Sequence, residues 1–203
     1  MRYWLMKSEP GDVSIDDLAA LPEQTVAWYG VRNYQARNFM RDQMHIGDGV
    51  LYYHSNCAVP GIAGIARVSS VAYPDATQFE RNSKYFDPKA TPETPRWFNV
   101  DVKLVKKIEL IPLAVLRKLP ELERMRILQR GNRLSITPLD PSEWKYILTV
   151  MANHHTNDET AIRYDRSPLS SSLPYGERDK VSLRESHVNA FGTQLTWSGR
   201  LPI

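Results

Sequence analysis

The side chains best suited to chemistry lie close together in one short stretch, Tyr-Tyr-His-Ser-Asn-Cys, at residues 52–57. It contains His54, Ser55, Asn56 and Cys57, the single cysteine of the chain. A cysteine or serine nucleophile needs a base within hydrogen-bond reach and a third group that orients this base. The stretch could therefore be a nucleophilic active site, or the polar wall of a pocket that binds a ligand without changing it.

The alternation of side chains along a strand argues against catalysis by neighbours in this stretch. Residues 50–56 are largely apolar and aromatic, which predicts a strand. Successive side chains of a strand point to opposite faces, so His54 cannot readily serve Ser55. No nucleophile-elbow, zinc-protease, paired-acid or phosphate-loop motif occurs in the sequence. A hydrolase or transferase that uses Cys57 and His54 stays open as the alternative. The structural interpretation is that His54 is a core histidine bonded to the backbone and that Cys57 is a small buried apolar residue.

Three side chains of this region suit the recognition of a flat polar heterocycle. Tyr53 offers a ring, Ser55 a hydroxyl, and Asn56 an amide that both donates and accepts hydrogen bonds. A second stretch places Trp28 just before a helix that Asn33 is expected to cap. A tryptophan beside arginines and a helix N-terminus could stack a base and hold its phosphate. Equally, Trp28 could close the end of a barrel, with the arginines solvated.

Composition limits the class of protein. The chain has 203 residues, of which 42% are hydrophobic, enough for one globular core or a core with an appendage. Its formal net charge of +3 permits nucleic-acid binding without requiring it. No apolar run approaches the roughly 18–20 residues that span a bilayer, and the first residues lack a secretory signal pattern. We expect a cytoplasmic protein with no cofactor and no membrane contact. We also expect no metal, because His154 and His155 lack further ligands.

The elements expected to position these residues form an α+β domain. Strands are predicted at residues 2–7, 50–56, 60–73 and 97–110. A short helix is predicted to begin at Ser14, and further helical segments at residues 33–44, 113–125, which Pro120 interrupts, and 141–151. Gly61 and Gly64 interrupt the third strand, which is typical of a bulge, a barrel corner or a close approach of another group. Short strands bent by glycine and separated by short helices predict a small curved sheet or barrel.

The character of the sequence changes after Ala152. Residues 153–203 show no sustained periodicity, and they contain three prolines and a run of serines. This composition is typical of a tail that is disordered or only loosely docked. Such a tail could dock a protein partner, so an interaction subunit is a third possible function.

Several segments, in order between Met1 and Ala152, closely resemble the EVE domain family. They are YWLMKSEP, SIDDL, W-GVRNYQARN-MRD, GD-VLYYHSNC--PGIAGIA, YPD-T-F, S-YFDPK----PRW--VDV and NRLSITPL. The resemblance implies a PUA-like fold over residues 1–152, a small mixed β-barrel flanked by short helices and related to the YTH domains that read methylated adenine. Residues 153–203 depart from the family.

What the resemblance implies for function is a non-catalytic module that binds DNA or RNA carrying a modified base, such as methylated cytosine or adenine. Trp28 would form one wall of an aromatic cage and Tyr85 a second, while Ser55 and Asn56 would read the edge of the base. The expected base-binding residues are Trp28, Ser55, Asn56, Tyr53, Tyr85 and Asn33. The expected phosphate contacts are Arg32, Arg37, Arg41, Arg133 and Lys7.

Overall fold

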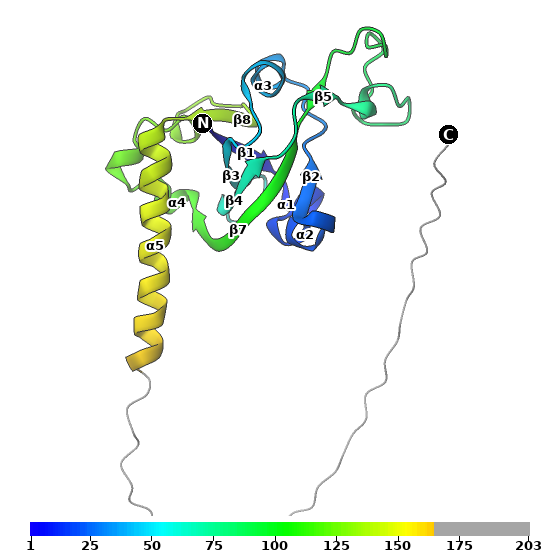
Figure 1. Cartoon of the computed structure of the whole chain (residues 1–203). Coiled ribbons are helices and arrows are strands. Elements are labelled where there is room, and N and C mark those ends of the chain that lie inside the picture. The colour runs from blue at the N-terminus through cyan, green and yellow to red at the C-terminus, as the bar shows by residue number, and fades with distance from the viewer. Residues whose placement is uncertain (165–203) are drawn as a thin grey trace, which may run out of the picture. The chain divides into compact units, whose positions relative to one another are not determined.

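A curled, mixed sheet of six strands forms the centre of the protein, whose computed structural model describes residues 1–164 (Figure 1). The strand order is β2-β7-β4-β3-β1-β8, and β1 runs parallel to β3 while the other neighbours are antiparallel. The strands are β1 (Tyr3–Ser8), β2 (Thr25–Ala27), β3 (Gly49–His54), β4 (Gly61–Val68), β7 (Asp101–Pro112) and β8 (Ile136–Leu139). A separate ribbon pairs β5 (Tyr73–Pro74) with β6 (Phe98–Asn99). Because β1 and β3 are parallel, both end at the same edge of the sheet.

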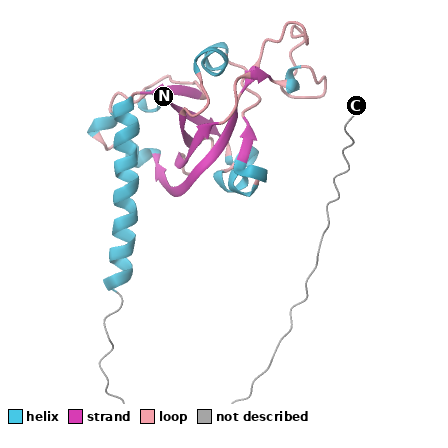
Figure 2. Ribbon diagram, in the orientation of Figure 1, coloured by secondary structure: helices cyan, strands magenta, loops and turns pink. Residues whose placement is uncertain are grey.

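Short helices surround the sheet, and one long helix follows the last strand (Figure 2). The α-helices are α1 (Pro10–Val13), α2 (Ile15–Ala20), α3 (Tyr34–Asn38), α4 (Leu113–Leu116) and α5 (Pro141–Tyr164). A π-helical turn (Phe39–Gln43) continues α3, and single 3₁₀ turns lie at Pro22–Gln24, Ala76–Gln78, Pro120–Leu122 and Arg126–Leu128. Among the described residues, no helix is long and apolar enough to cross a membrane.

Side-chain caps start the helices where the sequence predicts them. The Ser14 hydroxyl accepts a hydrogen bond from the Asp17 backbone N–H, and the Asp17 carboxylate accepts one from the Ser14 backbone N–H. The Asn33 side-chain oxygen accepts from the backbone N–H groups of Gln35 and Ala36 at 2.9 and 3.1 Å. These local bonds fix where the chain enters α2 and α3.

Two apolar cores cover the two faces of the sheet, and β1 and β3 contribute to both. Trp4 of β1 and Tyr52 of β3 belong to the core that also contains Trp28. Leu5 and Tyr53 belong to the second core, which α5 covers. Central strands buried on both faces read as nearly continuous apolar runs, as these two do. Tyr53, 2% exposed, therefore lies on the opposite face of the sheet from Trp28.

The glycine prediction for the third strand is confirmed. The pairing register between β4 and β7 shifts between Ile62 and Gly64. A Cβ atom at Gly64 would lie 2.6 Å from the Cδ1 atom of Ile15, the first residue of α2. The glycine thus lets α2 pack directly on the sheet.

The predicted α+β class and the small curved mixed sheet with short helices are confirmed. The sequence missed β2 and β8, which have three and four residues. The predicted end of the last helix, Met151, is also too early, because α5 continues to Tyr164. Most of the predicted tail, residues 165–203, lies outside the described residues. The boundary at residue 152 and the protein partner of the tail stay predictions.

Candidate functional site

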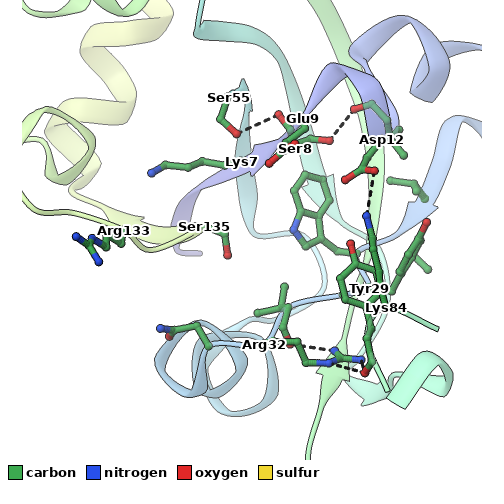
Figure 3. Close-up of a pocket in the computed structure, with 18 residues that line it drawn as sticks. Lys7, Ser8, Glu9, Asp12, Tyr29, Arg32, Ser55, Lys84, Arg133 and Ser135 are labelled. Carbon is green, nitrogen blue, oxygen red and sulfur yellow. Dashed lines mark hydrogen bonds and ion pairs between the residues drawn. The ribbon is translucent and has the colours of Figure 1, made fainter. Parts of the chain in front are cut away.

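A pocket of about 510 Å³ opens at the sheet edge where β1 and β3 end (Figure 3). Small-molecule sites typically enclose roughly 300–1,000 Å³. It is lined by residues 7–9 at the end of β1, residues 12 and 13, residues 26–33 at the end of β2 and beyond, Ser55 after β3, residues 84 and 85, Arg133 and Ser135. Lys7, Ser135 and Arg133 lie on one side of the view and Tyr29 and Lys84 on the other. The parallel pair thus brings together segments that are far apart in the sequence.

Trp28 forms a rigid wall of this pocket. Its backbone N–H donates to the Val100 carbonyl oxygen at 2.8 Å, which continues the pairing of β2 with β7. The indole meets the Tyr52 ring edge-on, with centroids 5.5 Å apart, and the residue is 8% exposed. The indole therefore closes the first core and also lines the pocket, and its stacking on a base stays a prediction.

Tyr85 also lines the pocket, and its ring packs on Gly30. A Cβ atom at Gly30 would lie 2.6 Å from the Tyr85 Cζ atom, and the φ angle of Gly30 is +81°. Both the backbone conformation and the close approach require glycine at this position. The ring of Tyr29 contacts Tyr85 edge-on at a centroid distance of 6.0 Å. Three aromatic side chains, Trp28, Tyr29 and Tyr85, therefore line one pocket.

Arg32 lines the pocket, but its side chain donates its hydrogen bonds to other groups of the protein. Its Nε and Nη2 atoms donate to the Tyr85 carbonyl oxygen at 2.9 and 2.6 Å. Its Nη1 atom forms an ion pair of 2.8 Å with Asp75, which is 1% exposed, and Nη2 also donates to Thr77. Burial by itself raises the pKa of Asp75, but hydrogen bonds from Thr77, Arg32 and Gly30 outweigh burial and lower that pKa overall. Arg32 thus holds the loop that carries Tyr85.

Of the two expected edge readers, the structure places Ser55 in the pocket and Asn56 behind it. The Ser55 backbone N–H donates to the Ser8 carbonyl oxygen at 2.9 Å. Asn56 does not line the pocket, and its φ of +51° marks a turn in which asparagine is favoured. Its side-chain amide donates to the Glu9 carboxylate at 3.0 Å, and Glu9 lines the pocket. Nothing in the sequence marked Glu9 as a pocket residue, because its contact with Asn56 joins positions 47 residues apart.

Two of the five expected phosphate contacts line the pocket without an internal partner. Within residues 1–153, the side chains of Lys7 and Arg133 make no hydrogen bond or ion pair. Burial lowers the pKa of Lys7, which is about half-buried. The pocket also receives Lys84, which forms an ion pair of 3.5 Å with Asp12.

The remaining expected phosphate contacts, Arg37 and Arg41, lie outside the pocket lining. Arg37 donates to the Arg96 carbonyl oxygen at 2.5 Å. Arg41 forms a bidentate ion pair with the Asp42 carboxylate, with hydrogen bonds of 2.7 and 2.9 Å. Asn33 lines the pocket, but its side-chain oxygen serves as the cap of α3.

His54 has a structural partner. Its Nε2 atom accepts a hydrogen bond from the Ile15 backbone N–H at 3.0 Å, at the start of α2. Burial lowers the pKa of His54, in keeping with a neutral ring that accepts this bond. The interpretation of His54 as a histidine bonded to backbone is confirmed. Cys57 is half-buried and shares no hydrogen bond with His54 in the described part of the chain.

Comparison with known proteins identifies the family. The family model for the EVE domain matches residues 2–150. Human thymocyte nuclear protein 1 is 45% identical over 165 residues, which cover 73% of this chain and 73% of that protein. The thymocyte nuclear protein 1 of Danio rerio is 43% identical over 165 residues, covering 72% and 71% of the two chains. The cytoplasmic location expected from the sequence stays a prediction, and these relatives are named as nuclear proteins.

Solved structures share the fold. A protein from Leishmania major is 47% identical with a TM-score of 0.71, over 76% of this chain and 97% of that chain. Human thymocyte nuclear protein 1, crystallised in complex with DNA containing 5-methylcytosine, is 43% identical with a TM-score of 0.69. That match covers 74% of this chain and 98% of the human one. The predicted family and its PUA-like fold are confirmed, and the chain belongs to the EVE domain family.

Proposed function

We propose that this protein binds nucleic acid without catalysis and holds a modified nucleobase in the pocket lined by Trp28 and Tyr85. The observation that carries the proposal is an aromatic-lined pocket whose wall includes two cations, Lys7 and Arg133, that have no side-chain partner within residues 1–153. Aromatic stacking platforms next to positive charge are typical of proteins that bind single-stranded nucleic acid. The related human protein that was crystallised with 5-methylcytosine DNA makes methylated cytosine the first candidate base.

The aromatic residues supply affinity and preference for the modification. Stacking one base on an aromatic ring contributes roughly 1–3 kcal/mol. A methyl group buried against apolar atoms adds about 0.8 kcal/mol. That increment corresponds to roughly a fourfold preference, so a larger preference requires a close fit around the methyl group. The rigid Trp28 wall, packed on Tyr52, supplies a surface that does not yield when the base enters.

The polar residues at the sheet edge read the base. The Glu9 carboxylate can accept a hydrogen bond from an exocyclic amino group, which cytosine and adenine carry. Asn56 orients this carboxylate, and the Ser55 hydroxyl offers a second polar contact in the pocket. In this proposal Asn56 acts through Glu9, whereas the sequence placed it against the base.

Contacts with phosphate groups bind the backbone of the nucleic-acid strand. Lys7 and Arg133 line the pocket, and their side chains have no partner within residues 1–153, so each can neutralise a phosphate of the bound strand. Extruding a base from a duplex costs a few kcal/mol, so single-stranded or mismatched sites should bind more tightly. The proposal covers both DNA and RNA, which differ at the 2′-hydroxyl.

A titration followed by fluorescence anisotropy tests the proposal. Labelled single-stranded oligonucleotides carry one central cytosine that is unmodified, methylated or hydroxymethylated, or one methylated adenine, at a fixed salt concentration. The proposal predicts a preference of at least fourfold for one modified base. Equal affinities for all the oligonucleotides would reduce the protein to a general nucleic-acid binder, and no binding would refute the proposal.

The rival function, a hydrolase or transferase that uses Cys57 and His54, has a separate test. The Ile15 backbone N–H occupies the His54 Nε2 atom, which weighs against a role as a general base. We expect Cys57→Ser to bind the preferred oligonucleotide as tightly as the natural protein does. Turnover of any nucleotide that Cys57→Ser abolished would instead establish the enzyme.

A further inference from the structure

An exposed tyrosine lies directly beside the pocket and takes no part in it. Tyr34 follows Asn33, which lines the pocket, and begins α3. The residue is 48% exposed, although its ring stacks on Trp97 with centroids 4.9 Å apart and planes at 26°. Trp97 fixes the position of this ring, and the exposed part of the ring can contact a ligand.

The ring beneath Tyr34 is fixed from several sides. Trp97 is 5% exposed, and its indole N–H donates to the Asp87 carboxylate at 2.7 Å. The Cζ atom of Arg32 lies 5.3 Å from the centre of Trp97 and 5.2 Å from the centre of Tyr85. A continuous series of rings and one guanidinium thus runs from Tyr85, in the pocket wall, through Arg32 and Trp97 to Tyr34 at the surface.

Positive charge surrounds Tyr34. The Cζ atoms of Arg37 and Arg96 lie 4.9 and 5.7 Å from the centre of its ring, and Arg96 donates a hydrogen bond to its hydroxyl. Arg96 forms an ion pair with Asp87 at 3.3 Å. Arg37 donates to two neutral oxygen atoms, those of the Asn38 side chain and the Arg96 backbone, and makes no ion pair in residues 1–153. We call Tyr34, Arg37 and Arg96 the Tyr34 platform.

We propose that the Tyr34 platform binds the nucleotide next to the base held in the pocket. The flanking base stacks on the exposed Tyr34 ring, and Arg37 contacts the phosphate between the two nucleotides. This inference rests on the proposed function, because the pocket must first hold a base of the same strand. Every base has a flat face, so this contact adds affinity without adding sequence preference. It also explains why two arginines gather outside the pocket, around one exposed aromatic residue.

A double-mutant cycle between protein and ligand tests the platform. The ligand is a single-stranded oligonucleotide with one central 5-methylcytosine, and its variants carry an abasic site immediately 5′ or 3′ of that base. The protein variant is Tyr34→Ala, and thermal unfolding checks that it is folded at the temperature of the titration. We expect Tyr34→Ala to weaken binding of the intact oligonucleotide about five- to tenfold, the lower part of the range for one stacked base.

The cycle predicts a specific pattern. An abasic site on one side of the 5-methylcytosine should cost the same factor, and in that oligonucleotide Tyr34→Ala should have no further effect. An abasic site on the other side should leave the effect of Tyr34→Ala unchanged. Tyr34→Phe, which keeps the ring, should bind like the natural protein, and Tyr146→Ala on α5 serves as an aromatic control away from the pocket.

Three results would overturn the platform. Unchanged affinity in Tyr34→Ala for the intact oligonucleotide would remove it while leaving the pocket proposal in place. An equal loss with every oligonucleotide, abasic ones included, would show that Tyr34 acts on the pocket and not on a flanking base. If the natural protein bound none of the oligonucleotides, the proposed function would fail and the platform with it.

Discussion

The Arg32 guanidinium contacts both the backbone and the ring of Tyr85. Two of its guanidinium nitrogens donate to the Tyr85 carbonyl oxygen, at 2.9 and 2.6 Å, and its Cζ atom lies 5.2 Å from the centre of the Tyr85 ring. The same guanidinium forms an ion pair with buried Asp75. The position of a pocket wall therefore depends on one side chain that has little left to offer a ligand.

Substitution of Arg32 should weaken binding through Tyr85 and not through lost charge. Lysine cannot reproduce the planar fork, so Arg32→Lys leaves Asp75 and the Tyr85 carbonyl partly unpaired. We expect a stability loss of roughly 3 kcal/mol in a urea titration, as for a broken buried pair. We also expect weaker binding of the preferred oligonucleotide, with an unchanged slope of log affinity against log salt concentration. In Arg32→Gln, which removes the charge, a slope smaller than that of the natural protein would mean that Arg32 contacts phosphate directly.

Replacing Gly30 by alanine should displace the Tyr85 ring while keeping the backbone N–H of residue 30 that donates to Asp75. In Gly30→Ala the new methyl group would meet the Tyr85 ring, and the φ of +81° adds strain of roughly 1–2 kcal/mol. Gly47→Ala is the matched control, because Gly47 also has a positive φ, +93°, but nothing lies within 4 Å of its Cβ position. Thermal unfolding should show both variants destabilised, while the oligonucleotide titration should show weaker binding only for Gly30→Ala. Equal affinities would contradict the role of Tyr85 as a wall.

Asp75 should make the free energy of unfolding depend on pH in the acidic range. Hydrogen bonds from Thr77, Arg32 and Gly30, acting against burial, keep the pKa of Asp75 below its ordinary value. A lowered pKa in the folded state contributes stability that is present above the unfolded pKa, about 3.9, and is lost as pH falls through the folded pKa. The stability difference between the natural protein and Asp75→Asn should therefore be constant above about pH 5 and shrink below about pH 4. Asp12→Asn, at an exposed ion pair, should show little difference at any pH.

Lys7 and Arg133 should account for part of the salt dependence. We expect Lys7→Gln and Arg133→Gln each to lower oligonucleotide affinity about three- to fivefold and to reduce the salt slope by about 0.7, the share of one phosphate on a single strand. Because burial lowers the pKa of Lys7, its contribution should disappear at a lower pH than that of an ordinary lysine. Lys145→Gln and Arg124→Gln, away from the pocket lining, should change neither quantity. Slopes that match the natural protein would exclude both cations from phosphate contact.

Local signals in the sequence predicted local structure well. The caps at Ser14 and Asn33 bond to backbone groups within three residues, so residue types and spacing suffice to place them. Tyr53 shows where such reasoning ends. Strand alternation placed it on the same face as Ser55, but β3 ends at His54, and the chain then turns. Ser55 reaches the pocket while Tyr53 faces the core beneath α5.

Long-range pairing decided the rest of the site. Arg32 reads as a solvated or phosphate-binding residue until Asp75, 43 residues away, is seen to be its partner. Glu9 gains its place in the pocket from Asn56, 47 residues on, and from the parallel pairing of β1 with β3. Nothing in the residue types alone distinguishes Arg32, which has internal partners, from Arg133, whose side chain has none in the described part of the chain.

The central claim, that Trp28 helps to select a modified base, is tested most directly by one ratio. This is the affinity for the 5-methylcytosine oligonucleotide divided by that for its unmethylated twin, measured for the natural protein and for Trp28→Leu at the same salt concentration. Leucine keeps apolar volume in the core but removes the stacking face, and a ratio is insensitive to a partly unfolded sample. We predict a ratio of at least four for the natural protein that falls to about one in Trp28→Leu. The same ratio in both proteins would contradict the role of Trp28 as the wall that recognises the modification.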